Sequence, residues 1–312
     1  MIRQVAAEDD YGSAASPGWR HTDWSQFERD TMIGSRRLRY LDVGEGERCF
    51  VLVHGMGGRW QHWLETIPAL ARHGRVLALD LPGFGRSQRA NPRATVDGFA
   101  DTAAALARQL GQRRVVLIGH SMGGPIAIRF AARHPDLAEA IVLVCGATYQ
   151  FSNLLGLRNV RRFMVERPRE TAAIAMEIAT AGLPAPRPLR RLIVASPRLR
   201  KLFLSPYVRD PSALPADALR LVVDGAGAPG VFPAVRAIAR ADPLDGIDKV
   251  RCPILSLAAD NDRIVPLPDT EAFQHDVPRA QTVVFAGCGH MPMLERPEAF
   301  TTELINFTRT LP

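Results

Sequence analysis

The chain has 312 residues, of which 46% are hydrophobic and 23% are charged, and its formal net charge is +7. This length suits one large α/β domain with room for an inserted subdomain. The sequence contains no run of 18 apolar residues, so we expect no membrane span, and its arginines match no nucleic-acid-binding module, so we expect no nucleic-acid partner.

The first residues of the chain are polar and mixed in charge. Residues 1–17 lack the apolar core of a secretory signal, so we expect a flexible tail and a cytoplasmic protein. The cysteines form no C-x-x-C pair and no cluster with histidine at zinc spacing; they are Cys49, Cys145, Cys252 and Cys288. We therefore expect buried thiols, and neither a metal nor a cofactor.

Strand and helix patterns alternate through the first half of the chain. Residues 36–44 alternate apolar and polar side chains, as a strand near a sheet edge does. Continuous apolar runs, which are typical of buried parallel strands, occupy residues 49–55, 75–83, 114–121 and 138–146. Helical spacing occurs at residues 60–71, 96–110 and 123–134. This order predicts βαβ units and a parallel sheet with helices on both faces.

The alternation stops after residue 146. Residues 147–245 are basic and rich in proline, with amphipathic helical stretches and no convincing buried strand. Strand patterns return at residues 252–260 and 280–287, and residues 297–310 form a last helix. We therefore predict an α/β core of residues 18–146 and 246–312, with a mostly parallel, doubly wound sheet of about eight strands. A helical insertion of residues 147–245 interrupts this core.

The stretch Gly119-His120-Ser121-Met122-Gly123 joins a predicted strand to a predicted helix. It fits the pattern G-x-S-x-G, in which a sharp turn lifts a serine hydroxyl above the sheet. The glycines allow strand and helix to approach closely, and the helix N-terminus favours negative charge beside the hydroxyl. A serine in an ordinary turn is the alternative, but this context favours a nucleophile.

A serine nucleophile needs a base, and the base needs an acid that orients it. His290 lies in a loop after a predicted strand. Because loops at the carboxyl ends of parallel strands open on the same edge of a sheet, we expect His290 to meet Ser121.

The orienting acid should follow the predicted strand at residues 252–260. The candidates there are Asp260, Asp262 and Asp269. Asp262 lies far enough past the strand to turn back towards His290, and Asp260 is the second choice. The end of the strand at residues 138–146 offers no acid, because the chain continues as Cys-Gly-Ala-Thr-Tyr-Gln.

A transition state with negative charge on oxygen also needs N–H donors. We expect one from Met122, the residue after the nucleophile, and one from Met56 in the glycine-rich loop His-Gly-Met-Gly-Gly at residues 54–58. His54 stands at a strand end directly before glycine, which favours a role in organising this loop over a role as the base.

Together these motifs closely resemble the α/β-hydrolase family. The resemblance covers residues 36–312 and rests, in chain order, on LVHGMGG, LALDLPGFGRS, GHSMGG, DNDRIVP and GCGHMPMLERPEAF. It implies the α/β-hydrolase fold, the catalytic order Ser121, Asp262, His290, and a helical cap over the active site at residues 147–245. Apolar residues of this cap are expected to line the pocket or to pack its helices together; they include Tyr149, Phe151, Leu154, Leu155, Phe163, Phe203 and Tyr207.

The resemblance implies a carboxylic ester hydrolase of small molecules with a hydrophobic acyl or alcohol group, acting through an acyl-enzyme on Ser121. Serine at this position argues against haloalkane dehalogenases and epoxide hydrolases, which use aspartate there. Hydrolases of C–C bonds remain an alternative, although they usually carry an HGxGPG-like loop and asparagine before the serine, where this chain has HGMGG and His120. Two further functions stay open: a thioesterase that binds phosphate through the cap's arginines, and a small-molecule receptor that keeps the same three residues.

Overall fold

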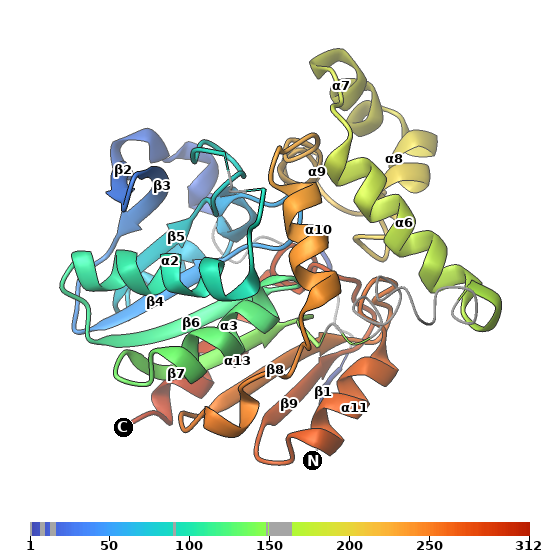
Figure 1. Cartoon of the computed structure of the whole chain (residues 1–312). Helices are drawn as coiled ribbons and strands as arrows, with labels where there is room; N and C mark the ends of the chain where they lie inside the picture. The colour runs from blue at the N-terminus through green and yellow to red at the C-terminus, as the bar shows by residue number, and fades with distance from the viewer. Residues whose placement is uncertain (1, 7–9, 13–16, 90–91, 148, 150–163) are drawn as a thin grey trace.

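The computed structural model describes residues 2–6, 10–12, 17–89, 92–147, 149 and 164–312. Its centre is a nine-stranded sheet with the order β1-β9-β8-β7-β6-β4-β5-β3-β2 (Figure 1). The strands are β1 (Ile2–Val5), β2 (Glu28–Ile33), β3 (Arg36–Val43), β4 (Arg48–Val53), β5 (Arg75–Leu79), β6 (Arg114–His120), β7 (Ala138–Val144), β8 (Ile254–Ala259) and β9 (Gln281–Phe285). Neighbouring strands are parallel across the sheet except at one edge, where β3 pairs antiparallel with both β5 and β2. The predicted mostly parallel α/β sheet is confirmed.

The sheet has nine strands, where the sequence predicted about eight. The two outermost strands, β1 and β2, were not predicted. Strand β1 pairs with β9 in residues that we expected to belong to a flexible tail, so the tail prediction is wrong for Ile2–Val5. Strand β2 forms a hairpin with β3 through Gly34, whose φ is 59°. Both are edge strands with several exposed side chains, so neither has the apolar pattern that identifies a buried strand.

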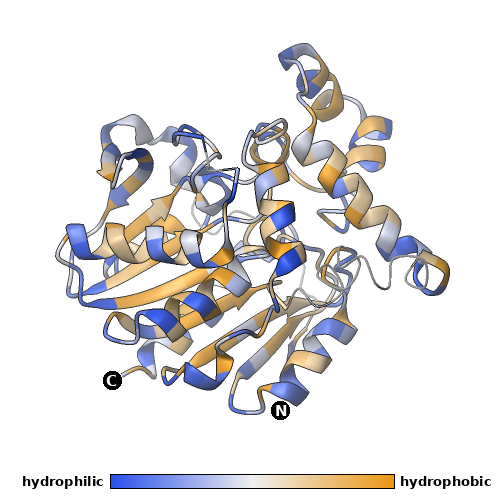
Figure 2. Ribbon diagram, in the orientation of Figure 1, coloured by the Kyte–Doolittle hydropathy of each residue, from blue (hydrophilic) through white to orange (hydrophobic). Residues whose placement is uncertain are grey.

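Helices cover both faces of the sheet, as predicted. Helices α2 (Val96–Gln109), α3 (Gly123–Arg133) and α11 (Leu267–Asp276) pack on one face, and α13 (Pro297–Arg309) packs on the other. Alternate residues of one strand serve the two layers: in β4, Val51 belongs to the core under α2 and α3, whereas Phe50 belongs to the core under α13. Figure 2 shows the hydrophobic residues along the central strands and polar residues on the outer sides of the helices.

The helix that we predicted over residues 60–71 is two short pieces. Trp60–Trp63 is a 3-10 helix (η3), and Ile67–Leu70 is a single α-helical turn (α1). Pro68 lies in the first turn of α1, and a proline has no N–H to continue a helix that begins earlier. The shorter remaining elements are η1 (Pro17–His21), η2 (Trp24–Phe27), η4 (Ile247–Lys249) and α12 (Pro292–Glu295).

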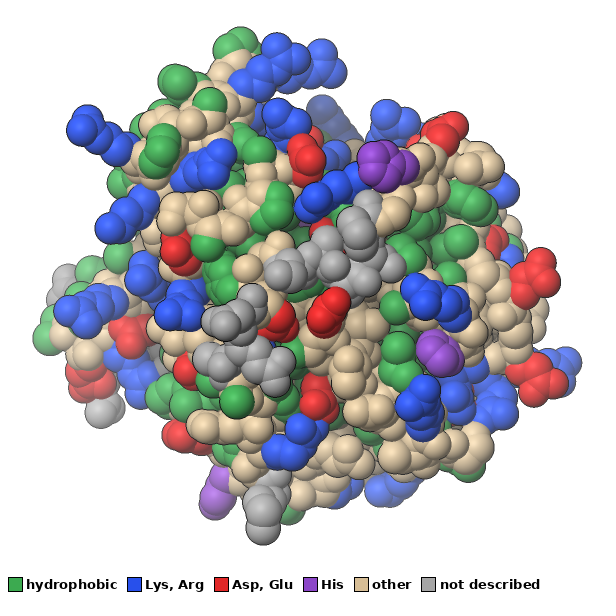
Figure 3. Space-filling model, turned by 180° about the vertical axis from the view of Figure 1, so that it is seen from behind, with side chains coloured by type: hydrophobic (Ala, Val, Ile, Leu, Met, Phe, Trp, Pro, Cys, Tyr) green, Lys and Arg blue, Asp and Glu red, His purple; other side chains and the backbone are tan. Residues whose placement is uncertain are grey.

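The chain between β7 and β8 forms helices over its described residues. They are α6 (Pro168–Gly182), α7 (Arg187–Ala195), α8 (Pro197–Leu204), α9 (Ala216–Val223) and α10 (Val231–Arg240). Helix α9 contacts η3 and α10 contacts α2, while α6, α7 and α8 stand beyond the sheet (Figure 1). Figure 3 shows lysine and arginine side chains gathered over this part of the surface. Among the described residues, no helix has the length and apolarity to cross a bilayer.

Candidate active site

Ser121 occupies the sharp turn between β6 and α3. Its φ of 52° is positive, a conformation that only Ser121 and Cys145 adopt among the described non-glycine residues. The Ser121 N–H donates to the carbonyl of Val144 and the Ser121 carbonyl accepts from the N–H of Gly124, both at 2.8 Å. The turn is therefore held on both sides in a strained backbone geometry that is typical of a nucleophile elbow.

Two glycines give this turn the space that it needs. A Cβ atom on Gly119 would lie 2.0 Å from the carbonyl oxygen of Gly123. A Cβ atom on Gly123 would lie 2.8 Å from the carbonyl oxygen of Val53. Strand β6, helix α3 and strand β4 thus approach each other more closely here than any larger residue allows.

His290 and Asp262 are joined by a buried hydrogen bond. His290 Nδ1 donates to Asp262 Oδ2 at 2.7 Å, and the two side chains are 2% and 0% exposed. Asp262 Oδ1 accepts the N–H groups of Ile264 and Val265, each at 2.8 Å, which fixes the carboxylate. Because Nδ1 carries the proton, Nε2 of His290 has a free lone pair, and it has no hydrogen-bond partner among the described residues.

The surroundings of His290 favour its acting as a base. Burial opposes the charged form of His290, but the charge and hydrogen bond of Asp262, with the charge of Glu177, outweigh burial and raise the pKa of His290 above its ordinary value. A histidine with this bias accepts a proton more readily than a free imidazole.

The other predicted acids do not take the place of Asp262. Asp260 is exposed and its Oδ1 accepts from Asn261 Nδ2 at 2.6 Å and from Cys288 N at 3.3 Å. Asp269 lies in the first turn of α11. Of the three candidates, the structure brings Asp262 into hydrogen-bonding contact with His290.

The two predicted N–H donors lie on the chain beside Ser121 and in the loop after β4. Among the described residues, neither the N–H of Met122 nor that of Met56 has an acceptor. Met122 directly precedes α3, where the helix dipole favours an anion. Neither N–H is therefore taken up by another of the described residues.

His54 holds the loop that carries Met56. Its Nδ1 donates to the carbonyl of Gly55 at 2.7 Å, and its Nε2 accepts the N–H of Leu81 at 3.0 Å. Burial lowers the pKa of His54 to about 4, so the ring is neutral at pH 7. These contacts agree with the loop-organising role that its position in the sequence indicated.

Cys145 lies close to the same pair. Ligand atoms of Cys145, Asp262 and His290 lie within 4.8 Å of one another, a spacing that a metal ion could bridge. Burial, and then the charge of Asp262, raise the pKa of the Cys145 thiol well above its ordinary value, which disfavours the thiolate that a metal needs. Both carboxylate oxygens of Asp262 already accept hydrogen bonds. The chemistry of this group therefore fits a hydrogen-bonded set better than a metal site.

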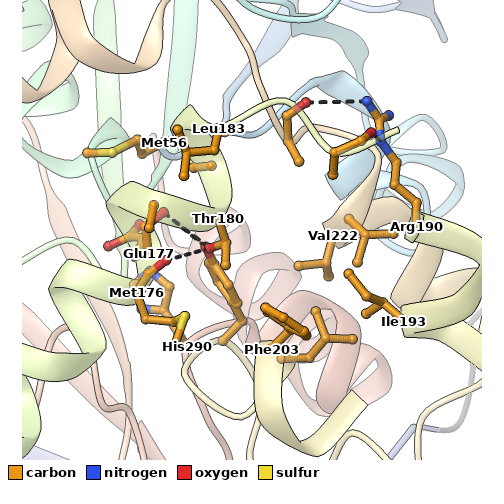
Figure 4. Close-up of a pocket in the computed structure, with 18 of the residues that line it drawn as sticks. Met56, Met176, Glu177, Thr180, Leu183, Arg190, Ile193, Phe203, Val222 and His290 are labelled. Atoms are coloured by element: carbon orange, nitrogen blue, oxygen red, sulfur yellow. Dashed lines mark hydrogen bonds between the residues drawn. The ribbon is translucent and has the colours of Figure 1, made fainter. Parts of the chain in front are cut away.

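Ser121 and His290 line a cavity of about 330 Å³ (Figure 4). Most of its wall comes from apolar residues of the insertion, which include Met176, Leu183, Ile193, Phe203, Leu204 and Val222. Of the aromatic residues expected at the pocket, Phe203 and Tyr207 line it, whereas Tyr149 donates to Asp276 at 3.1 Å and does not. Phe151, Leu154, Leu155 and Phe163 lie outside the described residues.

Two buried glutamates near His290 were not predicted from the sequence. Glu177 lies on α6 and lines the cavity. It shares the buried face of the helix with Ala173, Ile174 and Ala181, and this spacing could have identified it as a carboxyl on an apolar face. Glu295 lies five residues after His290 and is 0% exposed.

Glu295 fixes the loop that carries His290. Its carboxylate accepts the N–H groups of the two flanking residues, Gly289 at 2.9 Å and Met291 at 3.1 Å. It has two further donors at 2.8 Å, the N–H of Arg209 from the insertion and the hydroxyl of Tyr11 from the N-terminal segment. One buried carboxylate therefore ties two distant parts of the chain, the insertion and the N-terminal segment, to the loop.

We expect Glu295→Gln to lower the free energy of unfolding by about 1 to 3 kcal/mol, because the new amide N–H group faces donors that then lack an acceptor. The value of kcat for the best substrate should fall about tenfold or more, because His290 loses its fixed position. Urea unfolding and steady-state kinetics measure both effects. Glu298→Gln, on the exposed side of α13, is the control and should change neither. Unchanged stability and kcat in Glu295→Gln would contradict this role.

The sequence matches the model of one protein family, described as alpha/beta hydrolase fold, over residues 49–297. Among curated relatives, the dihydrolipoyllysine-residue acetyltransferase component of the acetoin cleaving system of Pseudomonas putida is 41% identical over 116 residues, which are 37% of this chain and only 31% of that protein. The 2-hydroxy-6-oxo-2,4-heptadienoate hydrolase of Pseudomonas putida is 27% identical over 290 residues, 88% of this chain and 94% of that protein.

A similar solved structure is that of a thermophilic esterase from Thermogutta terrifontis with malate bound. It has a TM-score of 0.65 and 25% sequence identity, and the likeness covers 90% of this chain and 98% of that one. Relatives of comparable similarity therefore include both an esterase and a hydrolase of a dienoate.

Proposed function

The chain belongs to the α/β-hydrolase family, and on this basis we propose that it is a serine hydrolase of neutral carboxylic esters with a hydrophobic acyl or alcohol group. The proposal assigns Ser121 as nucleophile, His290 as general base and acid, and Asp262 as the residue that orients His290. We also propose that residues 147–245 form a cap over this site, because α6 to α9 supply most of the cavity wall.

The main support for the proposal is the hydrogen bonding of His290, in which one ring nitrogen is held and the other has no partner among the described residues. Its Nδ1 is held by Asp262 at 2.7 Å, and its unpartnered Nε2 belongs to a residue that lines the same cavity as Ser121. In the proposed first step, Ser121 Oγ attacks the ester carbonyl and its proton passes to His290 Nε2. The N–H groups of Met56 and Met122 donate to the oxygen that becomes negative.

The collapse of this intermediate completes the reaction. The C–O bond to the leaving alcohol breaks, and His290 returns the proton to that oxygen, which leaves an acyl group on Ser121. A water molecule then attacks the acyl carbonyl while His290 takes one of its protons. The acid product departs when Ser121 regains its proton.

The charges of the cavity favour a neutral ester over a carboxylate-bearing substrate. A 2-hydroxy-6-oxo-dienoate is an anion, and it needs a free cation in the pocket. Arg190 is the only lysine or arginine among the described lining residues. Its guanidinium donates to the carbonyls of Ala185 at 2.6 Å and Asp224 at 3.1 Å, and also pairs with the Asp224 carboxylate. The carboxyl group of Glu177 lies in the same cavity and repels an anion in its ionised form.

Cleavage of a C–C bond is the second candidate. The similarity to the heptadienoate hydrolase over most of both chains favours it. The paired state of Arg190 and the presence of Glu177 count against it.

We expect kcat/KM for p-nitrophenyl esters of short and medium chain length to exceed that for a 2-hydroxy-6-oxo-dienoate by at least about 100-fold, because the cavity offers the anion no partner. Nitrophenolate release and loss of the dienoate absorbance measure the two reactions on one preparation. Faster dienoate cleavage would establish the second candidate instead. A folded protein that turns over neither substrate and does not react with a serine-directed phosphonate would leave only a binding role.

A further inference from the structure

Glu177 is a buried carboxyl that the proposed reaction does not use. It is 2% exposed, it lines the cavity, and its Oε2 has no hydrogen-bond partner among the described residues. Figure 4 shows Glu177 with Met176 and His290 at one end of the cavity, while Arg190, Ile193 and Val222 lie at the other. The carboxyl group therefore belongs to the end of the cavity where the reaction is proposed to occur.

Packing of the helix does not explain this residue. The buried face of α6 otherwise consists of small or apolar residues, among them Ala173, Ile174 and Ala181. An unpartnered buried carboxyl destabilises a protein unless something pairs with it. Burial raises the pKa of Glu177 to about 7, and the nearby charge of His290 opposes that rise. The carboxyl group of Glu177 is therefore destabilising, lies close to His290, and has one oxygen without a hydrogen-bond partner among the described residues.

The neighbouring hydroxyl groups do not serve this oxygen. The Thr180 hydroxyl contacts the carbonyl of Met176 at 2.7 Å and the Tyr207 hydroxyl at 2.5 Å. The Tyr207 hydroxyl also approaches the main-chain carbonyl of Glu177 at 3.3 Å, not its carboxyl group. Both hydroxyls are thus engaged with each other and with the backbone of α6.

The other free side-chain polar atoms of the cavity residues are acceptors as well. Nε2 of His62 donates to the carbonyl of Leu221 at 3.0 Å, and Nε2 of His120 donates to the carbonyl of His290 at 2.8 Å. Nδ1 of each ring is therefore an unprotonated acceptor, and neither has a partner among the described residues. Burial lowers the pKa of both histidines, which keeps both rings neutral. The N–H groups of Met56 and Met122 are assigned to the ester oxygen, so the remaining free polar atoms complement a ligand that supplies a donor.

We propose that Glu177 determines specificity by accepting a hydrogen bond from an O–H or N–H group that the substrate carries near its ester carbonyl. The preferred substrates are then hydroxy-esters or amino-esters, in which the donor lies a few bonds from the carbonyl and the rest of the molecule is apolar. This inference rests on the proposed ester hydrolysis at Ser121 and narrows it to a class of ester.

Three matched esters test the inference: ethyl butyrate, ethyl 3-hydroxybutyrate and ethyl 3-aminobutyrate, with acid release followed in a pH-stat. We expect kcat/KM of the wild-type protein to be about 10- to 100-fold higher for at least one of the donor-bearing esters than for ethyl butyrate, the range for a hydrogen bond to a charged group. A preference for the amino-ester alone would mean that Glu177 selects substrates with an ammonium group. A preference for both donor-bearing esters would mean that it accepts either kind of donor.

Variants of α6 show whether Glu177 causes the preference. Glu177→Leu should abolish it, so that the three esters have kcat/KM values within about threefold of one another. Glu177→Gln keeps an acceptor oxygen and should retain part of the preference for the hydroxy-ester while losing that for the amino-ester. Glu170→Gln, in the first turn of the same helix and outside the cavity lining, is the matched control and should behave as wild type.

The results separate this inference from the proposed function. Equal kcat/KM for all three esters, or a preference that survives Glu177→Leu in a protein with wild-type thermal unfolding, overturns the inference while ester hydrolysis stands. Absence of hydrolysis of every ester, together with absence of phosphonate labelling, overturns both.

Discussion

Replacing Ser121 with alanine is expected to reduce kcat for ester hydrolysis by about 10⁴-fold or more, because the acyl-enzyme can no longer form. Alanine accepts the backbone of this turn as serine does, so the variant removes only Oγ. The residual rate would come from binding and from the N–H donors of Met56 and Met122. Pre-steady-state kinetics with a p-nitrophenyl ester in excess over enzyme should show an initial burst of nitrophenolate for the wild type and none for the variant.

A serine elsewhere on the protein provides the control for this prediction. Ser25 is exposed and its hydroxyl hydrogen bonds only to Asp23 among the described residues, so Ser25→Ala should keep full activity and full phosphonate labelling. Ser121→Ala should lose the label while thermal unfolding stays near that of the wild type. Labelling that persists in Ser121→Ala would place the nucleophile at another residue.

The second large effect is expected for Asp262→Asn, which should lower kcat by about 10⁴-fold. The asparagine amide donates a hydrogen bond where His290 Nδ1 now donates, so the imidazole turns to the wrong tautomer and its Nε2 no longer accepts a proton. Asp260→Asn is the matched control and should change kcat by less than about threefold, because Asp260 is exposed and contacts Asn261 and Cys288 instead. A larger loss in Asp260→Asn than in Asp262→Asn would reverse the assignment.

The pH profile gives an independent readout of the same pair. The base form of His290 is lost as the pH falls through its pKa, so kcat/KM should have an acid limb. Asp262 raises the pKa of His290 through its charge and hydrogen bond. Removing that charge lowers the pKa, and the acid limb of Asp262→Asn should move to lower pH than that of the wild type. An acid limb at the same pH in both proteins would mean that Asp262 does not act on the titrating group.

The central strands could be predicted because burial on both faces leaves a continuous apolar run. Strand β4 reads Cys-Phe-Val-Leu-Val from Cys49, and all five residues are buried. The edge strands β1 and β2 face water on more of their surface, so their sequences look like a polar tail and a loop. Their pairing depends on a partner strand, which is β9 for β1, and local sequence patterns do not contain that information.

Some residues of the candidate site could likewise be predicted from the sequence, and others could not. Ser121 and His290 lie in motifs whose neighbours also reveal a strand end and a helix start, so their meeting follows from sheet topology. Glu177 lies in an alanine-rich helix of the insertion, and its role depends on which face of α6 turns to the cavity. Glu295 could be recognised only once its four donors, from three separate segments, were placed around it.

The pairing of β1 with β9 affects whether separate molecules of this protein can associate through the edge of the sheet. Residues of β1 are aligned one to one with Thr282–Phe285, so they occupy the backbone groups along that side of β9. The outer side of β1 is only four residues long, and Arg3 and Gln4 are exposed on it. Without β1, the apolar stretch Thr-Val-Val-Phe would form an open edge, which is a template for a strand from another chain. The short N-terminal strand thus protects the sheet against aggregation by edge-to-edge pairing.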